Sequence, residues 1–150
     1  MDIDRGFDGE NTKERTRLKA LVARLSDADL ARPLEAGWTV AAVLAHVAFW
    51  DQRALVLLER WRQAGLAAVP RAIDEADVDW INDAGKPLFL AMPPRRAAET
   101  ALAIAEAIDR TIASLPEEFV TRNAAAGTPV SLLRAEHRRE HLDEIETALR

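Results

Sequence analysis

Apolar residues recur every three or four positions along most of the chain, which is the spacing of one face of an α-helix. The clearest stripe runs through the second long segment and includes Val43, His46, Val47 and Trp50. These stripes predict helices over residues 9–25, 39–63, 76–91, 93–115 and 128–150, with a short turn from Ser26 through Leu30.

Residues that start or stop helices set the predicted boundaries. Thr39 has the side chain of an N-cap, and Gly65 is suited to ending the same helix. Pro116 ends the fourth long helix, and Thr128, which is followed by a proline, starts the last one. Pro87 lies inside the third helix and predicts a kink there.

Composition supports the same fold class. Alanine makes up about a fifth of the chain and is the strongest helix former. No run of alternating β-branched residues and no Asn-Gly or Asp-Gly hairpin signal is present. Four long helices and a shorter one predict an all-α four-helix bundle, formed as a single domain over residues 1–150. The stripes alone do not define the order in which the helices pack.

Charge and apolar length narrow the classes of partner. The net charge is −5, so no chain-wide attraction to nucleic acid or to an anionic membrane is expected. The most apolar stretch, from Val40 to Trp50, is much shorter than the roughly 20 residues that cross a bilayer. The acidic start has no apolar core of the signal-peptide kind, so a cytoplasmic location is expected.

Cysteine and tyrosine are both absent, so the candidate chemistry rests on histidine. The chain contains only His46, His137 and His141. The last two stand at i and i+4, which places two imidazoles on one helix face about a turn apart. If the two histidine-bearing helices face each other, three imidazoles converge. Three neutral nitrogens suit Zn, Ni, Fe or Cu, and three protein ligands with a fourth open position are typical of catalytic metal sites.

Two other interpretations fit the same spacing. The segment around His137 and His141 is rich in charged residues, so both side chains are also compatible with a solvated helix face. His46, on an apolar stripe, is also compatible with a core histidine that hydrogen-bonds a carbonyl group.

Two segments carry a family resemblance. The stretch from Gly37-Trp38-Thr39-Val40 through Leu44 to Asp51 resembles the second helix of the DinB/YfiT-like family, and residues 137–145 resemble its closing HxxxH helix. The turn at 25–30 and Asn82 fit as well, so the resemblance covers nearly the whole chain. It implies a bundle of DinB/YfiT type with up-down-down-up topology, in which His46, His137 and His141 are the metal ligands.

The resemblance also implies a class of reaction. Related proteins include mycothiol-dependent maleylpyruvate isomerases and thiol S-transferases that use bacillithiol, mycothiol or glutathione. The expected function is therefore a transferase or isomerase that depends on a divalent metal and uses a low-molecular-weight thiol and a small electrophile. Metal-dependent hydrolysis and a non-enzymatic metal- or ligand-binding role in stress are the alternatives. A homodimer is also expected, and the preference for Arg over Lys indicates a GC-rich bacterial genome.

Several other residues are candidates for supporting the histidines. Glu140 and Glu144 are close enough in sequence to orient an imidazole. Trp50 lies one turn after His46 and is a candidate pocket wall, and Asn82 is a candidate for the pocket mouth. Asp51 is either a partner of the site or a surface charge, and the surface interpretation is the simpler one.

Overall fold

The apolar stripes form helices over most of the chain. A computed structural model describes residues 4–150, so the first three residues of the acidic start lie outside the described part. Seven α-helices and one short 3₁₀ turn, Glu35–Gly37, occur in this range. The α-helices are α1 (Gly6–Arg24), α2 (Asp27–Leu30), α3 (Val40–Ala64), α4 (Glu75–Ala91), α5 (Pro94–Ala113), α6 (Glu117–Ala125) and α7 (Ala135–Ala148).

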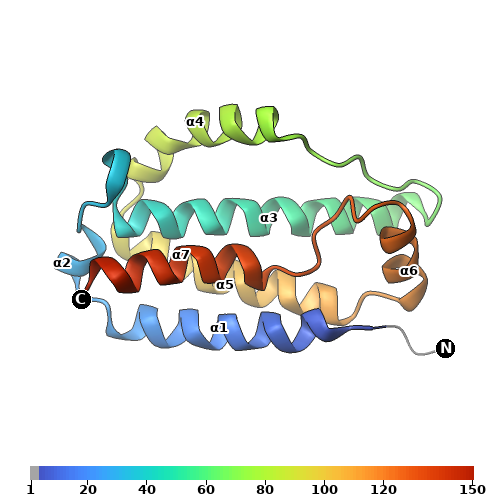
Figure 1. Ribbon diagram of the computed structural model, residues 1–150, viewed down its shortest axis with the longest axis horizontal. Coiled ribbons are helices and arrows are strands. Elements are labelled where there is room, and N and C mark those ends of the chain that lie inside the picture. Colours follow the sequence, from blue (N-terminus) through green and yellow to red (C-terminus); the bar gives the residue numbers. More distant parts are fainter. Residues whose placement is uncertain (1–3) are drawn as a thin grey trace.

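Four of these helices pack around a common interior. Helix α3 packs on α5 and α7, and α1 packs on the same two helices, so the four form a closed ring. Helices α1 and α7 run in one direction, and α3 and α5 run in the other (Figure 1). Helix α4 lies along the outer side of α3. The expectation of an all-helical protein is confirmed.

Small residues on α5 allow the closest packing in the interior. Its buried face begins with alanines, among them Ala97, Ala101 and Ala105, which are fully buried. Side chains of this size let the α3 backbone approach closely. Larger apolar residues fill the other end, where Trp61, Ile108 and other side chains make a second cluster.

The predicted boundaries of α3 are correct for physical reasons that the sequence displays. The Thr39 hydroxyl accepts a hydrogen bond from the Ala42 backbone N–H at 3.1 Å, which satisfies one of the free donors of the first turn. Gly65 follows the last helical residue with a φ of 101°, a backbone conformation that favours glycine. Pro87 is accommodated inside α4.

The start of the last helix is a correction. Helix α7 begins at Ala135 and not near Thr128, and α6, which was not predicted, precedes it. Thr128 itself has a φ of 58°, in the left-handed region, so it does not cap a helix. The Asn123 side chain bonds both backbone groups of Val130, at 2.8 and 3.0 Å. These bonds give the loop an alternative to helical pairing.

Helix α3 is also apolar and long enough, by length and composition, to cross a membrane. Most of its apolar window is buried against the other helices, as in the core helix of a bundle. The feature is therefore weak evidence for a membrane span.

Candidate metal centre

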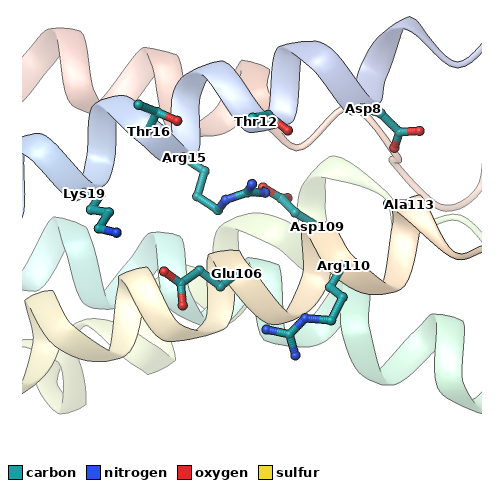
Figure 2. A pocket seen from close by; sticks show the side chains of 9 residues that line it. All are labelled: Asp8, Thr12, Arg15, Thr16, Lys19, Glu106, Asp109, Arg110 and Ala113. Atoms are coloured by element: carbon teal, nitrogen blue, oxygen red, sulfur yellow. The ribbon is translucent and has the colours of Figure 1, made fainter.

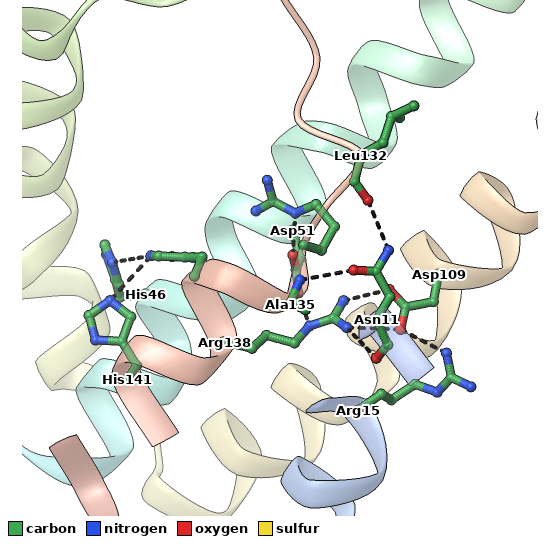
Figure 3. Close-up of polar contacts among 11 residues, drawn as sticks. Asn11, Arg15, His46, Asp51, Asp109, Leu132, Ala135, Arg138 and His141 are labelled. Atoms are coloured by element: carbon green, nitrogen blue, oxygen red, sulfur yellow. Dashed lines mark hydrogen bonds and ion pairs between the residues drawn. The ribbon is translucent and has the colours of Figure 1, made fainter. Parts of the chain in front are cut away.

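The three histidines meet at one point between α3 and α7. His46 comes from the second turn of α3, and His137 and His141 come from successive turns of α7. The Nε2 atom of His137 lies 3.1 Å from that of His46 and 3.2 Å from that of His141. Figure 3 shows His46 and His141 directed toward each other from the two helices. The fold therefore brings together side chains that are 91 positions apart in the chain.

The spacing of these nitrogens suits a tetrahedral metal ion. Zinc–nitrogen bonds of about 2.0–2.1 Å place two ligands of a tetrahedral ion about 3.3 Å apart. The nitrogens of the cluster that could bind an ion all lie within 4.8 Å of one another. The donor set thus fits a borderline or soft divalent ion better than Mg²⁺ or Ca²⁺, which prefer oxygen.

The surroundings of the cluster keep two of the imidazoles neutral. Burial, followed by the nearby His141, lowers the pKa of His46 to about 4. Burial, then His141 and the other neighbouring charges, lowers the pKa of His137 to about 3. The rings of Trp38 and Phe89 lie 5.7 and 6.3 Å from the His46 ring and supply part of this apolar environment. Because metal binding requires unprotonated nitrogen, both side chains are available as ligands at neutral pH.

The second ring nitrogens differ among the three histidines. The Nδ1 atom of His141 lies 3.2 Å from a carboxylate oxygen of Glu144, a contact that would fix the orientation of this ring. The Nδ1 atoms of His46 and His137 are buried, and neither has a hydrogen-bond partner among residues 4–150. The polar contacts of these two rings are therefore those of their Nε2 atoms within the cluster.

The cluster forms part of the wall of a cavity of about 610 Å³. Trp50, Asn82 and Glu140 line this cavity together with the histidines. The Trp50 indole N–H donates to the Asn82 side-chain oxygen at 2.8 Å, which connects α4 to α3 at the wall of the cavity. Glu144 lines a smaller cavity of about 230 Å³, which shares His46, Asn82 and His141 with the larger one.

Asp51 is a further correction, because it is not a surface charge. Its side chain is fully buried and is not among the residues that line the cavity. Arg134 Nε donates to one carboxylate oxygen at 2.8 Å, and Arg138 Nε donates to the other at 3.2 Å. Asp51 therefore binds to the helix that carries the histidine pair and does not contact the histidines itself.

Arg138 extends this pairing across the interior. It donates two hydrogen bonds to Asp109 of α5, at 2.7 and 2.8 Å, and Arg15 of α1 donates to the same carboxylate at 2.7 Å. Burial alone would lower the pKa of Arg138, but Asp109 and Asp51 raise it above its usual value. Figure 3 shows the path from Asp51 through Arg138 to Asp109 and Arg15, which connects all four helices of the bundle.

Comparison with known protein families gives a match. The family model described as the mycothiol maleylpyruvate isomerase N-terminal domain matches residues 12–146, which is nearly the whole chain. The chain belongs to this family. The resemblance to DinB/YfiT-like proteins is thereby confirmed, since this domain is of the DinB-like kind. Comparisons with curated proteins and with solved structures find no match.

In this member of the mycothiol maleylpyruvate isomerase N-terminal domain family, sequence reasoning missed the buried charges. Arg138 occupies the centre of the buried stripe of α7, together with Ala135, Leu142 and Ile145, and the histidines lie on the neighbouring stripe. The available signal was a charged residue at a core position. Asp109 gives the same signal on α5, next to Ile108 and one turn before Ile112.

A separate cavity of about 510 Å³ lies between α1 and α5 and contains none of the histidines (Figure 2). Its walls carry charges of both signs, and Arg15 is already paired there with Asp109. Because charges of both signs lie on these walls, the cavity has no concentration of one charge that would attract a charged ligand. The chemistry of this family member is therefore to be sought at the histidine cluster.

Proposed function

We propose that this chain is a divalent-metal-dependent enzyme that uses a low-molecular-weight thiol, either as a transferase or as an isomerase. The observation that carries the proposal is the convergence of three Nε2 atoms at the wall of a cavity of about 610 Å³. Membership of a mycothiol-related family supports the thiol. The second substrate is a small electrophile.

His46, His137 and His141 are the proposed ligands of the metal, which is Zn, Ni or Fe. Held by three neutral imidazoles, such an ion supplies Lewis-acid stabilisation of a thiolate near neutral pH. The chain itself supplies the binding space. Trp50 and Asn82 form one wall of the cavity, and α4 shields the cluster from solvent on that side.

The finer features of the fold belong to the same proposal. We propose the up-down-down-up topology of a four-helix bundle, and the opposite directions of the α1–α7 and α3–α5 pairs support it (Figure 1). A single domain over residues 1–150, a cytoplasmic location, and the absence of nucleic-acid or membrane partners stay predictions. The homodimer also stays a prediction, which sedimentation analysis of the purified protein would test.

Metal content is the first test. Wild-type protein is produced in medium that contains Zn, Ni, Fe and Mn together, because metal availability can override intrinsic preference. We expect about one equivalent of transition metal in the wild type and much less in His137→Ala. Glu136→Gln is the matched control, because Glu136 precedes His137 on α7 but is exposed and does not line the histidine cavity. A metal-free wild type, even after incubation near pH 8, would overturn the proposal.

Thiol dependence then separates the proposed reaction from the other metal-dependent chemistry. Loaded wild type is incubated with small electrophiles in the presence and absence of a low-molecular-weight thiol such as mycothiol. The proposal expects turnover only with the thiol, and loss of turnover in His137→Ala. Turnover without any thiol would identify a hydrolase instead, and metal binding without turnover under any of these conditions would identify a metal- or ligand-binding protein.

A further inference from the structure

Arg134 is a buried cation that faces the histidine cavity. The residue is 8% exposed and lines the cavity beside His137. Its Nε donates to Asp51, but its two terminal nitrogens make no hydrogen bond within residues 4–150. Neither terminal nitrogen is among the fully buried side-chain atoms that lack a partner, so both reach solvent while the residue lines the cavity. The open side of this guanidinium is therefore accessible to a ligand in the cavity.

Arg53 adds a second cation to the same wall. It stands one turn before Leu57 on α3, and its guanidinium carbon lies 5.7 Å from the centre of the Trp50 ring. No carboxylate lies within salt-bridge distance of Arg53 in the described part of the chain. Arg53 and Arg134 line the same cavity, and burial, followed by the charge of Arg134, lowers the pKa of Arg53 below its usual value.

The charges around the cavity do not cancel. Arg53 and Arg134 line it, and Glu140 is the only acidic residue among the described side chains that does so. Glu140 is exposed on α7, whereas Arg134 is buried. Asp51 does not restore the balance, because it is shared between Arg134 and Arg138. The cavity thus has an excess of positive charge next to the three imidazoles.

We infer that Arg53 and Arg134 form a binding site for a carboxylate group, directly beside the histidine cluster. The planar guanidinium fork with two free terminal nitrogens matches a carboxylate by two parallel hydrogen bonds. Thr128 and Ser131 line the same cavity and carry hydroxyl groups that can act as neutral donors. The site would hold an acidic small molecule with its remaining atoms toward the imidazoles.

This inference deepens the proposed function, on which it rests for the ligand's role as the electrophile. A substrate anchored by its carboxylate would present its reactive carbon next to the metal ligands, which gives the orientation that a bimolecular reaction needs. The binding site itself depends neither on the metal nor on the thiol. An experiment can therefore refute the carboxylate-binding site without refuting the proposed enzymatic function, and the reverse.

The test is calorimetric titration at low ionic strength, with protein as isolated and after removal of metal by a chelator. Succinate is the carboxylate probe, and succinamide is its uncharged counterpart of similar shape. Inorganic phosphate distinguishes carboxylate recognition from general oxyanion binding. We expect succinate to bind the metal-free protein, succinamide not to bind, and phosphate to bind more weakly than succinate. The metal content of each preparation is measured beside the titration, so loss of the metal site is not mistaken for loss of this one.

Arg53→Gln is the deciding variant, because removing the Arg53 charge breaks no ion pair in the described residues. We expect it to weaken succinate binding by about 10- to 100-fold, the effect of one charge-assisted contact. Arg134→Gln should weaken binding as well, with its fold checked by circular dichroism because Asp51 loses a partner. Arg62→Gln, exposed at the end of α3 and outside the cavity, is the matched control and should bind as wild type does. Equal binding of succinate and succinamide, tighter binding of phosphate, or unchanged affinity in Arg53→Gln would overturn the inference.

Discussion

Glu144 contacts the histidine cluster through the imidazole of His141. Its carboxylate oxygen lies 3.2 Å from Nδ1, the ring nitrogen that faces away from the cluster. A carboxylate in this position fixes the tautomer that leaves Nε2 free and increases the basicity of the ligand. The Nδ1 atoms of His46 and His137 have no such partner among residues 4–150. The contact with Glu144 is therefore the one Nδ1 contact that orients a ring of the cluster in the described residues.

We therefore expect Glu144→Gln to weaken metal binding by about tenfold, at the lower end of the range for such partners because the carboxylate is partly exposed. The measurement is competition with a chromophoric chelator at pH 7.5. Asp143→Asn is the matched control, since this neighbouring carboxylate pairs with Arg17 on α1 instead of a histidine. Equal affinity in Glu144→Gln and Asp143→Asn would contradict the role assigned to Glu144.

At the scale of the elements, the start of α7 depends on a residue from α1. The buried Asn11 side chain donates to the Leu132 carbonyl at 2.8 Å and accepts from the Ala135 N–H at 2.9 Å. It thereby gives a hydrogen-bond partner to the first backbone N–H of α7 and to the Leu132 carbonyl in the loop before that helix. Since His137 follows Ala135 by two residues, this contact also sets where the histidine pair begins.

Asn11→Ala should destabilise the protein by about 2–4 kcal/mol, because it leaves a buried donor and a buried acceptor unpaired. Urea unfolding followed by circular dichroism measures the change. Thr12→Ala, at the exposed neighbouring position of α1, should lie within about 0.5 kcal/mol of wild type. A small effect of Asn11→Ala, comparable with that of Thr12→Ala, would show that another group takes over these hydrogen bonds.

The same contact explains what the sequence could and could not predict. Helix α3 was correctly bounded because Thr39 and Gly65 act within a few residues of themselves. The beginning of α7 was wrong because it depends on Asn11 and Asn123, which are distant in sequence or hidden inside an unpredicted helix. The convergence of the histidines followed from their spacing and the family resemblance. The cations of the cavity did not, since Arg53 and Arg134 look like ordinary surface residues in the sequence.

At the scale of the whole molecule, a buried charge network holds the four helices in one arrangement. Arg138 of α7 links Asp51 of α3 to Asp109 of α5, and Arg15 of α1 completes the connection. Removing one member would leave a buried charge without a partner, which typically costs about 3–5 kcal/mol. The network lies directly behind Arg134, so the packing of the bundle and the charge of the cavity are set by the same residues.

The histidine cluster makes the stability of the metal-free molecule depend on pH. Burial lowers the pKa of His46 to about 4 and that of His137 to about 3, whereas both residues titrate near 6.5 in the unfolded chain. Between these values the unfolded state holds protons that the folded state does not. Acid therefore favours unfolding, and stability decreases as the pH falls from about 6.5 toward 4.

Each of these two histidines should contribute about 1.4 kcal/mol per pH unit to the slope within this window. The measurement is the free energy of urea unfolding of chelator-treated protein from pH 7.5 to 4.5. The comparison is the double variant His46→Gln, His137→Gln, which keeps every carboxylate and so retains their share of the pH dependence. Wild type should lose stability more steeply than this variant below pH 6.5, and the two should run parallel above pH 7. Parallel curves over the whole range would mean that the imidazoles of the folded protein take up protons as freely as those of the unfolded chain, and the cluster would then not be the neutral donor set that a metal ion requires.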